Sequence, residues 1–122
     1  MPTEPAPITL AEVVRRAAEI VDPDDTDAAV GDFEREFEDA DEPITAIEDI
    51  DERVGTVLSE LDPAVANGSL AVMGVLTTYL SYRRDELHAK PEELIRLAAR
   101  AEWKGDPPDA VRDWLADRGL SV

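Results

Sequence analysis

The segment Leu70–Leu80 constrains the fold of this chain more than any other. Its apolar residues lie almost all round a helical wheel: Leu70, Val72, Met73, Val75, Leu76, Tyr79 and Leu80. A helix that is apolar on every face is buried in the middle of its domain. Ala71, Gly74 and the length of the pattern favour a helix over a strand. The sequence therefore predicts a central helix at about 70–88, with Ser69 as its N-cap.

Amphipathic helices are predicted on both sides of this segment. Thr9 and Glu12 form a capping box before a helix that ends near Asp22. Thr26 or Asp27 caps a second helix to about Asp39. Apolar spacing from Ile44 to Leu61 then predicts one helix over 43–61, because Pro43 is tolerated in a first turn.

Two shorter helices are expected after Lys90-Pro91 and Asp106-Pro107, with Gly105 and Gly119 as their C-caps. The inward residues predicted for the first of them are Leu94, Leu97, Ala98 and Ala101, with Ile95 as a further candidate. We expect residues 1–8 to be a mobile tail and residues 9–122 to form one all-α domain. Its architecture is a compact bundle of five to six antiparallel helices around the central apolar helix, and no internal repeat is evident.

Negative charge is concentrated in the first two thirds of the chain. Residues 1–82 hold 20 of the 29 acidic residues and four of the twelve basic ones, a formal charge of −16, whereas residues 83–122 carry −1. This acidity, with two lysines against ten arginines, resembles proteins of salt-loving archaea. Molar salt screens such repulsion, because the Debye length is about 3 Å at 1 M. We therefore expect a high-salt environment.

The chain has no cysteine, which excludes disulfides and thiolate metal sites. Its first residues have no cationic and apolar pattern typical of a signal peptide, and no apolar run reaches the length of a membrane span. These features predict a cytoplasmic protein that does not enter a membrane.

Eleven carboxylates and a single cation occupy residues 22–42. Asp22, Asp24 and Thr26 match the first ligands of a calcium loop, but Asp27 and Phe33 stand where that loop needs Gly and Glu. A solvated acidic face is the simplest interpretation. An alternative is mimicry of nucleic acid by the acidic segment 22–52, because carboxylates along a helix present a phosphate-like field.

The candidate partner-binding residues lie near the C-terminus. Arg96, Arg100 and Lys104 recur at helical spacing on one face, and Trp103 and Trp114 are candidate anchors because tryptophan is enriched at binding hot spots. The cations can bind carboxylates of a partner or phosphates of a nucleic acid. The helix pair at about 92–118 partly matches helix-turn-helix DNA readers, although charged residues and two prolines interrupt the pattern.

Residues that carry catalysis are scarce. Asp85 and His88 lie one helical turn apart and are weak candidates for metal ligands, but carboxylate-bridged bundles need two such motifs and His88 is the only histidine. No nucleophile elbow or phosphate-binding glycine loop is present. The sequence therefore predicts no enzyme and no cofactor. The favoured function is a protein–protein interaction or regulatory module, with a protein partner or self-association, and the alternative is a nucleic-acid-associated regulator.

Overall fold

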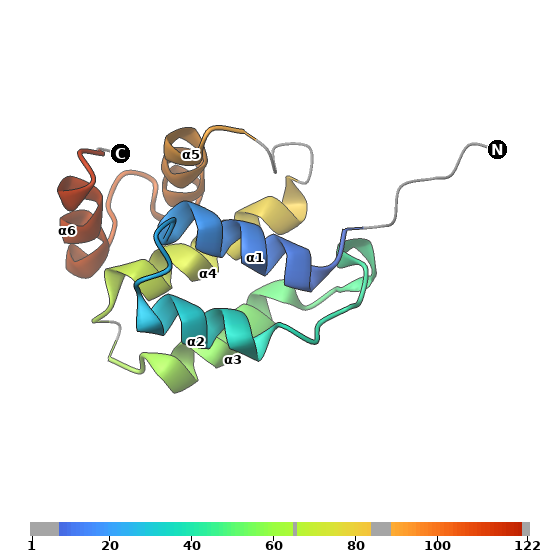
Figure 1. Ribbon diagram of the computed structural model, residues 1–122. Helices are drawn as coiled ribbons and strands as arrows, with labels where there is room; N and C mark the ends of the chain where they lie inside the picture. The colour runs from blue at the N-terminus through green and yellow to red at the C-terminus, as the bar shows by residue number, and fades with distance from the viewer. Residues whose placement is uncertain (1–7, 65, 84–88, 121–122) are drawn as a thin grey trace.

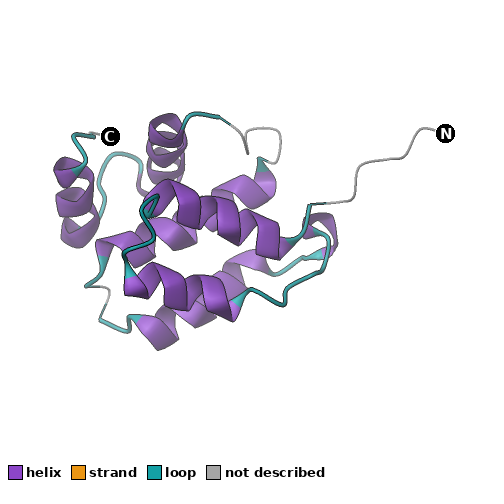
Figure 2. Ribbon diagram, in the orientation of Figure 1, coloured by secondary structure: helices purple, strands orange, loops and turns teal. Residues whose placement is uncertain are grey.

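A computed structural model describes residues 8–64, 66–83 and 89–120 of the chain. In these residues, helices pack against one another as a compact bundle without strands (Figures 1 and 2). The helices are α1 (Leu10–Val21), α2 (Ala28–Glu36), α3 (Ile50–Leu61), α4 (Gly68–Tyr82), α5 (Pro91–Trp103) and α6 (Asp109–Asp117), with a short 3-10 helix, η1 (Ile44–Ala46). The predicted all-α class is confirmed.

Helix α4 occupies the centre, as its sequence predicts. It packs against each of the other five α-helices, and the side chains of Met73, Leu76 and Leu80 are fully buried. The helix begins two residues before the predicted start, because Asn67 rather than Ser69 caps it. Asn67 Oδ1 accepts hydrogen bonds from the Leu70 amide at 3.2 Å and from the Ser69 hydroxyl at 2.7 Å. The helix ends at Tyr82, and residues 84–88 of the predicted span lie outside the described residues.

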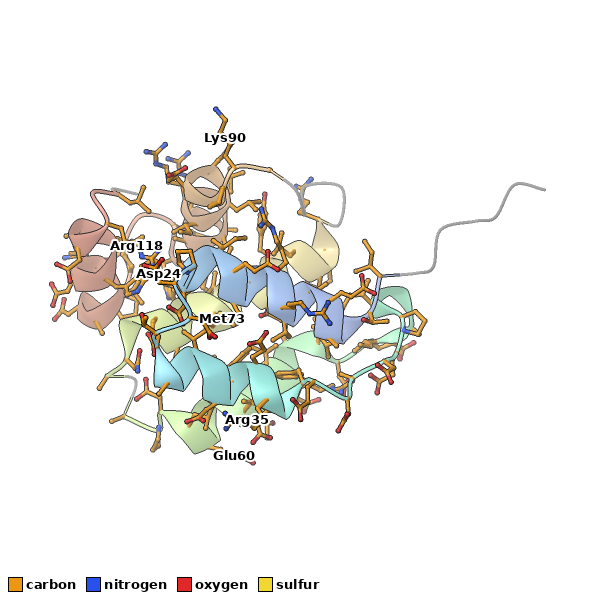
Figure 3. The ribbon with its side chains drawn as sticks, in the orientation of Figure 1. Asp24, Arg35, Glu60, Met73, Lys90 and Arg118 are labelled. Atoms are coloured by element: carbon orange, nitrogen blue, oxygen red, sulfur yellow. The ribbon has the colours of Figure 1, made fainter. Side chains whose placement is uncertain are left out.

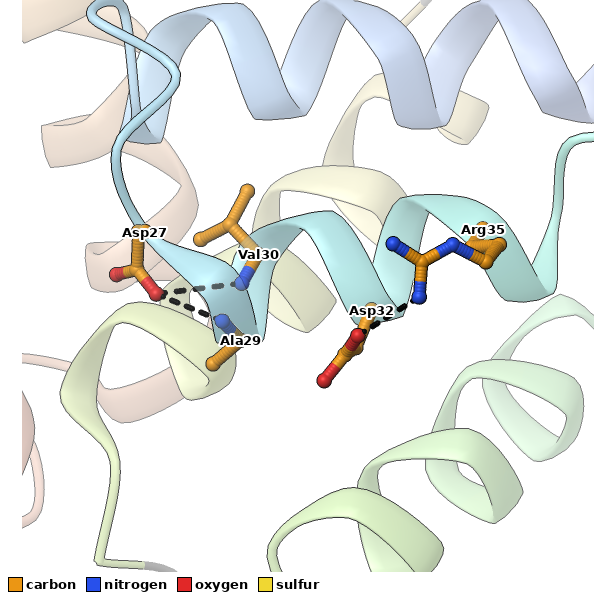
Figure 4. A network of polar contacts seen from close by, with 5 residues as sticks. All are labelled: Asp27, Ala29, Val30, Asp32 and Arg35. Carbon is orange, nitrogen blue, oxygen red and sulfur yellow. Dashed lines mark hydrogen bonds and ion pairs between the residues drawn. The ribbon is translucent and has the colours of Figure 1, made fainter.

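The predicted caps of the first two helices are confirmed. The Thr9 hydroxyl accepts a hydrogen bond from the Glu12 amide at 3.2 Å. Asp27 Oδ1 accepts from the amides of Ala29 and Val30 at 3.0 and 3.3 Å (Figure 4). Such bonds satisfy amides that have no partner inside a first helical turn. Helix α2 ends at Glu36, slightly earlier than predicted.

The single helix predicted over 43–61 is wrong. Residues 44–46 form η1, and α3 begins only at Ile50. The backbone before η1 bonds to the start of the chain instead: Ile44 donates to the Ile8 carbonyl at 2.8 Å and Leu10 to the Glu42 carbonyl at 3.2 Å. This pairing holds the segment extended up to Pro43, and the helix pattern of the sequence does not reveal it.

Helix α5 buries most of the face that its spacing predicts, but this face is rotated away from Ala101. Its buried residues are Leu94, Ile95, Ala98 and Ala99. Leu97 is half-buried and Ala101 is exposed, which contradicts the prediction for Ala101. The reason is that α5 packs against α1 as well as α4, and Ile95 lines a cavity with Ile20 of α1. Two neighbours rotate the buried face of α5 away from Ala101.

The end of α5 also differs from the prediction. Lys104, not Gly105, is the C-cap residue, with a left-handed φ of 52°, and Gly105 follows at φ 90°. Helix α6 begins at Asp109 after Pro108, two residues later than the predicted start. Within the described residues, no helix is long and apolar enough to cross a membrane.

Candidate docking surface

The cations predicted on α5 are all exposed. Arg96 and Arg100 lie within the helix, and Lys104 lies at its C-cap. Ion pairs within the described residues involve four other arginines, Arg16, Arg35, Arg53 and Arg112. The α5 cations therefore form no ion pair within that part of the chain.

A groove lies between the C-terminal half of α4 and α5, with a volume of about 250 Å³. Its lining is mainly apolar and includes Val75, Tyr79, Tyr82, Ala98 and Ala101, with the polar residues Thr78, Arg83 and Glu102 beside them. The small side chains of Ala98 and Ala101 leave this space open opposite the two tyrosines. Tyr82 is 64 % exposed, and it is the large hydrophobic residue that stands out most from the described surface.

The groove and most of the α5 cations lie on different faces of α5. Lys104 follows the groove residue Ala101 by three positions, about one helical turn, whereas Arg96 and Arg100 stand one, two or five positions from Ala98 and Ala101 and so face outward. Arg83 lines the groove from α4 and is exposed. We name this combined region, Tyr79, Tyr82, Arg83, Arg96, Arg100, Ala101 and Lys104, the α4–α5 surface. It comprises an apolar groove, with Arg83 and Lys104 near it, and the outward-facing cations Arg96 and Arg100 of the same helix.

The two tryptophans are half-buried and pack against the core. Trp103 is the last residue of α5, and Trp114 lies in α6. Trp114 also carries the Arg118 guanidinium over its ring, 4.2 Å from the ring centroid. Such a cation–π contact stabilises the fold locally. This placement gives Trp114 a role in packing, and the use of either ring as a partner anchor stays a prediction.

Arg118 ties the C-terminal region to the end of α1. Its guanidinium donates hydrogen bonds to the carbonyls of Ile20, at 3.3 Å, and Val21. These carbonyls belong to the last turn of α1, which has no partner for them inside the helix. Partial burial lowers the pKa of Arg118, while the charges of Asp22, Asp24 and Asp27 oppose that shift. Figure 3 shows Arg118 beside Asp24 at this end of the molecule.

The acidic segment 22–42 uses some of its carboxylates to build the fold. Both Asp22 oxygens accept backbone hydrogen bonds, from the Thr26 amide at 3.0 Å and the Asp27 amide at 2.9 Å. These bonds, first that from Asp27 and then that from Thr26, lower the pKa of Asp22 below its ordinary value. Within the described residues, no group of three or more acidic or histidine side chains is placed to hold a metal ion.

Helix α6 presents carboxylates where a DNA-reading helix needs cations. Asp109, Asp113 and Asp117 are exposed on it. Its Arg112 forms an ion pair with Asp106 at 3.1 Å. Because carboxylates repel phosphates, the helix pair α5–α6 is poorly suited to a major groove.

Sequence reasoning missed two residues of this region: Tyr82 and Arg118. Tyr82 lies two residues beyond the apolar pattern of α4, and its exposure is seen only in the structure. Arg118 contacts carbonyls 97 and 98 positions away, which no local pattern indicates. The metal candidates Asp85 and His88 lie outside the described residues.

Comparisons with protein-family models, curated proteins and solved structures find no match to this chain.

Proposed function

We propose that this protein is a non-enzymatic interaction module of a high-salt cytoplasm, which binds an acidic segment of another protein along the α4–α5 surface. The observation that carries this proposal is an aromatic groove on one side of α5 together with exposed cations on the same helix and at its end, which form no ion pair within the described residues. Apolar side chains of the segment would enter beside Tyr79 and Tyr82. Its carboxylates would meet Arg83, Arg100 and Lys104.

Charge favours a separate acidic protein over a second copy of the chain. A second copy would have to place its acidic N-terminal half on α5, because two α5 helices facing each other repel. A single contact of this kind is head-to-tail and builds rings or open chains, and a closed dimer needs two such contacts related by a two-fold axis. A distinct acidic partner satisfies the surface in a closed complex.

The apolar groove also suits binding at high salt. Exposed ion pairs contribute little there, because the Debye length is about 3 Å at 1 M. Burial of apolar area is not screened in this way and is strengthened by some salts. The groove therefore supplies affinity, and the cations select for an acidic partner.

Selection from a display library of random 16-residue peptides, in 0.5 M KCl, tests this function. We expect enriched peptides to be acidic and to contain aromatic or large aliphatic residues. Their affinity should fall about tenfold or more, about 1.4 kcal/mol, in Arg96→Gln/Arg100→Gln and in Tyr82→Ala. The control Arg15→Gln/Arg35→Gln removes two exposed cations of α1 and α2 and should bind as the wild type does.

Four outcomes would overturn the proposal. Enriched peptides could lack acidic residues, or they could bind the α5 variants as tightly as the wild type. A 20-base-pair duplex DNA could bind instead, with affinity that falls steeply as salt rises and is lost in Arg96→Gln/Arg100→Gln, which would support the nucleic-acid alternative. Sedimentation that shows chain growth with protein concentration would replace the acidic partner by a second copy.

The high-salt environment has its own test. We expect the melting temperature to fall as KCl is reduced below about 0.1–0.5 M, because the Debye length then grows toward 10 Å and the acidic surface repels itself. The triple variant Glu36→Gln/Glu38→Gln/Asp39→Asn removes three exposed charges of the α2 region and should weaken this dependence. A melting temperature independent of KCl would leave the acidity without this explanation.

A further inference from the structure

We propose that residues 9–40 and 49–80 are two copies of one helical hairpin, offset by 40 positions. We name them the first and the second hairpin. Helices α1 and α3 both contain 12 residues, and each boundary of α3 lies 40 positions after that of α1. Helices α2 and α4 begin at Ala28 and Gly68, again 40 positions apart. This inference is independent of the proposed function.

The turns of the two hairpins have the same construction. Each first helix ends on an aspartate, Asp22 or Asp62, that precedes a proline. Their φ and ψ angles are −134° and 68° for Asp22, and −145° and 66° for Asp62. The two aspartates therefore share one uncommon backbone conformation.

The carboxylates of these aspartates make equivalent hydrogen bonds. Asp22 accepts from the amides four and five positions ahead, at 3.0 and 2.9 Å. Asp62 accepts from the amides of Ala66 and Asn67, also four and five positions ahead, at 3.1 and 2.8 Å. In both cases the second amide belongs to the N-cap residue of the next helix. Each aspartate therefore closes a turn and fixes the start of the following helix.

The N-caps and the core positions correspond as well. Asp27 and Asn67 both accept amide hydrogen bonds of the following first turn, with φ near −100°. Five pairs of apolar residues 40 positions apart are buried in both hairpins: Leu10 and Ile50, Val14 and Val54, Val30 and Leu70, Phe33 and Met73, Ala40 and Leu80. The two hairpins therefore agree in three separate features: their N-caps, their turns and their buried positions.

The two hairpins pack against each other in a reciprocal way, as expected of two related units. Helix α1 packs on α4 of the other hairpin, and α3 packs on α2, while α2 and α4 pack on each other. The two Asp-Pro turns lie at the end of the bundle where α6 is found (Figure 1). Arg118 contacts the first hairpin there, and Ala110 and Trp114 approach Gly68 of the second.

The sequence hides this relationship. In the 32 aligned positions, four residue pairs are identical: Glu12 and Glu52, Val14 and Val54, Asp22 and Asp62, Pro23 and Pro63. So few identities explain why the sequence alone predicts no internal repeat.

Transplanting one turn into the other tests the equivalence. The chimera A64D/V65D/A66T/N67D gives the second hairpin the turn sequence of the first. In 2 M KCl, which screens the added charges, we expect cooperative unfolding within about 4 °C of the wild-type melting temperature. Amide exchange at positions 66 and 67 should remain slow. The control, the same chimera with Asp62→Ala, should lose that protection at least about tenfold.

Single substitutions in the native chain test the equivalence of the two turns without the chimera. Asp22→Ala should accelerate amide exchange at Thr26 and Asp27, and Asp62→Ala should do so at Ala66 and Asn67. Loss of protection at only one of these turns would overturn the proposal. A chimera that does not unfold cooperatively in 2 M KCl would overturn it too, since equivalent turns are interchangeable.

Discussion

The second helices of the two hairpins, α2 and α4, have equivalent N-caps, but their outer faces differ in polarity. Val72, Val75 and Tyr79 of α4 lie against α5, α6 or the groove beside them, whereas the equivalent positions in the first hairpin are Asp32, Arg35 and Asp39. Helices α5 and α6 cover α4, and no helix of the described chain covers that face of α2. Asp32 and Arg35 form an exposed ion pair at 2.9 Å there (Figure 4). The residues on the outer face of each helix therefore depend on whether another helix packs against that face, and not on the hairpin to which the helix belongs.

The first helices differ in the same way. Helix α1 packs between α2, α4 and α5 and has seven buried residues, whereas α3 has two, Ile50 and Val54. Positions that hold Val13 and Ile20 in α1 hold Arg53 and Glu60 in α3. Contact with the C-terminal helices therefore accompanies the burial of α1 and α4, whereas the outer faces of α2 and α3 are exposed and acidic.

The largest effect should come from the matched core positions Phe33 and Met73. Both side chains are fully buried, one in each hairpin. Phe33→Ala should lower the free energy of unfolding by about 3–5 kcal/mol and Met73→Ala by about 2–5 kcal/mol, because each leaves a cavity. Urea unfolding in 2 M KCl measures both. A loss below about 1 kcal/mol for Phe33→Ala would show that the first hairpin does not share the core.

Glycines give a second contrast between the hairpins. A Cβ atom at Gly68 of α4 would lie 2.3 Å from the Ala110 carbonyl oxygen of α6, whereas a Cβ at Gly31 of α2 meets nothing within 4 Å. Gly68→Ala should therefore displace α6 and cost about 1–3 kcal/mol. Gly31→Ala should stabilise the protein by up to about 1 kcal/mol, because alanine favours a helix. Thermal melting compares the two, and equal effects would contradict the uncovered position of α2.

Arg118 should matter next, because it joins α6 to the first hairpin. Arg118→Ala removes two hydrogen bonds to the end of α1 and the contact with Trp114. We expect a loss of about 1–2 kcal/mol in urea unfolding. Arg118→Lys keeps the positive charge but not the planar fork, so it should recover only part of that loss. Full recovery by lysine would mean that charge near Asp22 and Asp24 is what matters.

Local signals in the sequence predict most of the helices correctly. The all-round apolar pattern of residues 70–80 identifies the central helix, and Thr9 and Asp27 mark two N-caps. Predictions fail where a distant segment competes for the backbone or for a helix face. Residues 8–10 hold the segment before η1, and α1 rotates the buried face of α5.

The sequence predicts the cations of the α4–α5 surface but not its groove. Helical spacing finds Arg96 and Arg100, because periodicity is a local property. The groove is formed by Tyr79 and Tyr82 of one helix facing Ala98 and Ala101 of another, and their alignment depends on how α4 and α5 pack. The relation between the hairpins is hidden for a similar reason: geometry is kept by two Asp-Pro turns while most side chains differ.

The smallest predicted effect is the pH dependence of the first turn. Hydrogen bonds from the amides of Asp27 and Thr26 lower the pKa of Asp22 in the folded state. The stability that Asp22 contributes is therefore complete above its unfolded pKa of about 3.9 and is lost as pH falls through the lower folded pKa. Urea unfolding between pH 3 and pH 6 should show stability decreasing at the acid end.

Asp22→Asn should remove the part of this decrease that belongs to the turn, because an amide group does not titrate in that range. Asp24→Asn is the matched control: it deletes a charge from the same exposed turn, and no hydrogen bond to the Asp24 carboxylate is among those of the described residues. It should keep the wild-type slope. Since Asp22 closes the turn by accepting backbone hydrogen bonds, a slope that follows Asp24 instead would mean that repulsion among carboxylates, and not turn closure, sets the acid sensitivity of the first hairpin.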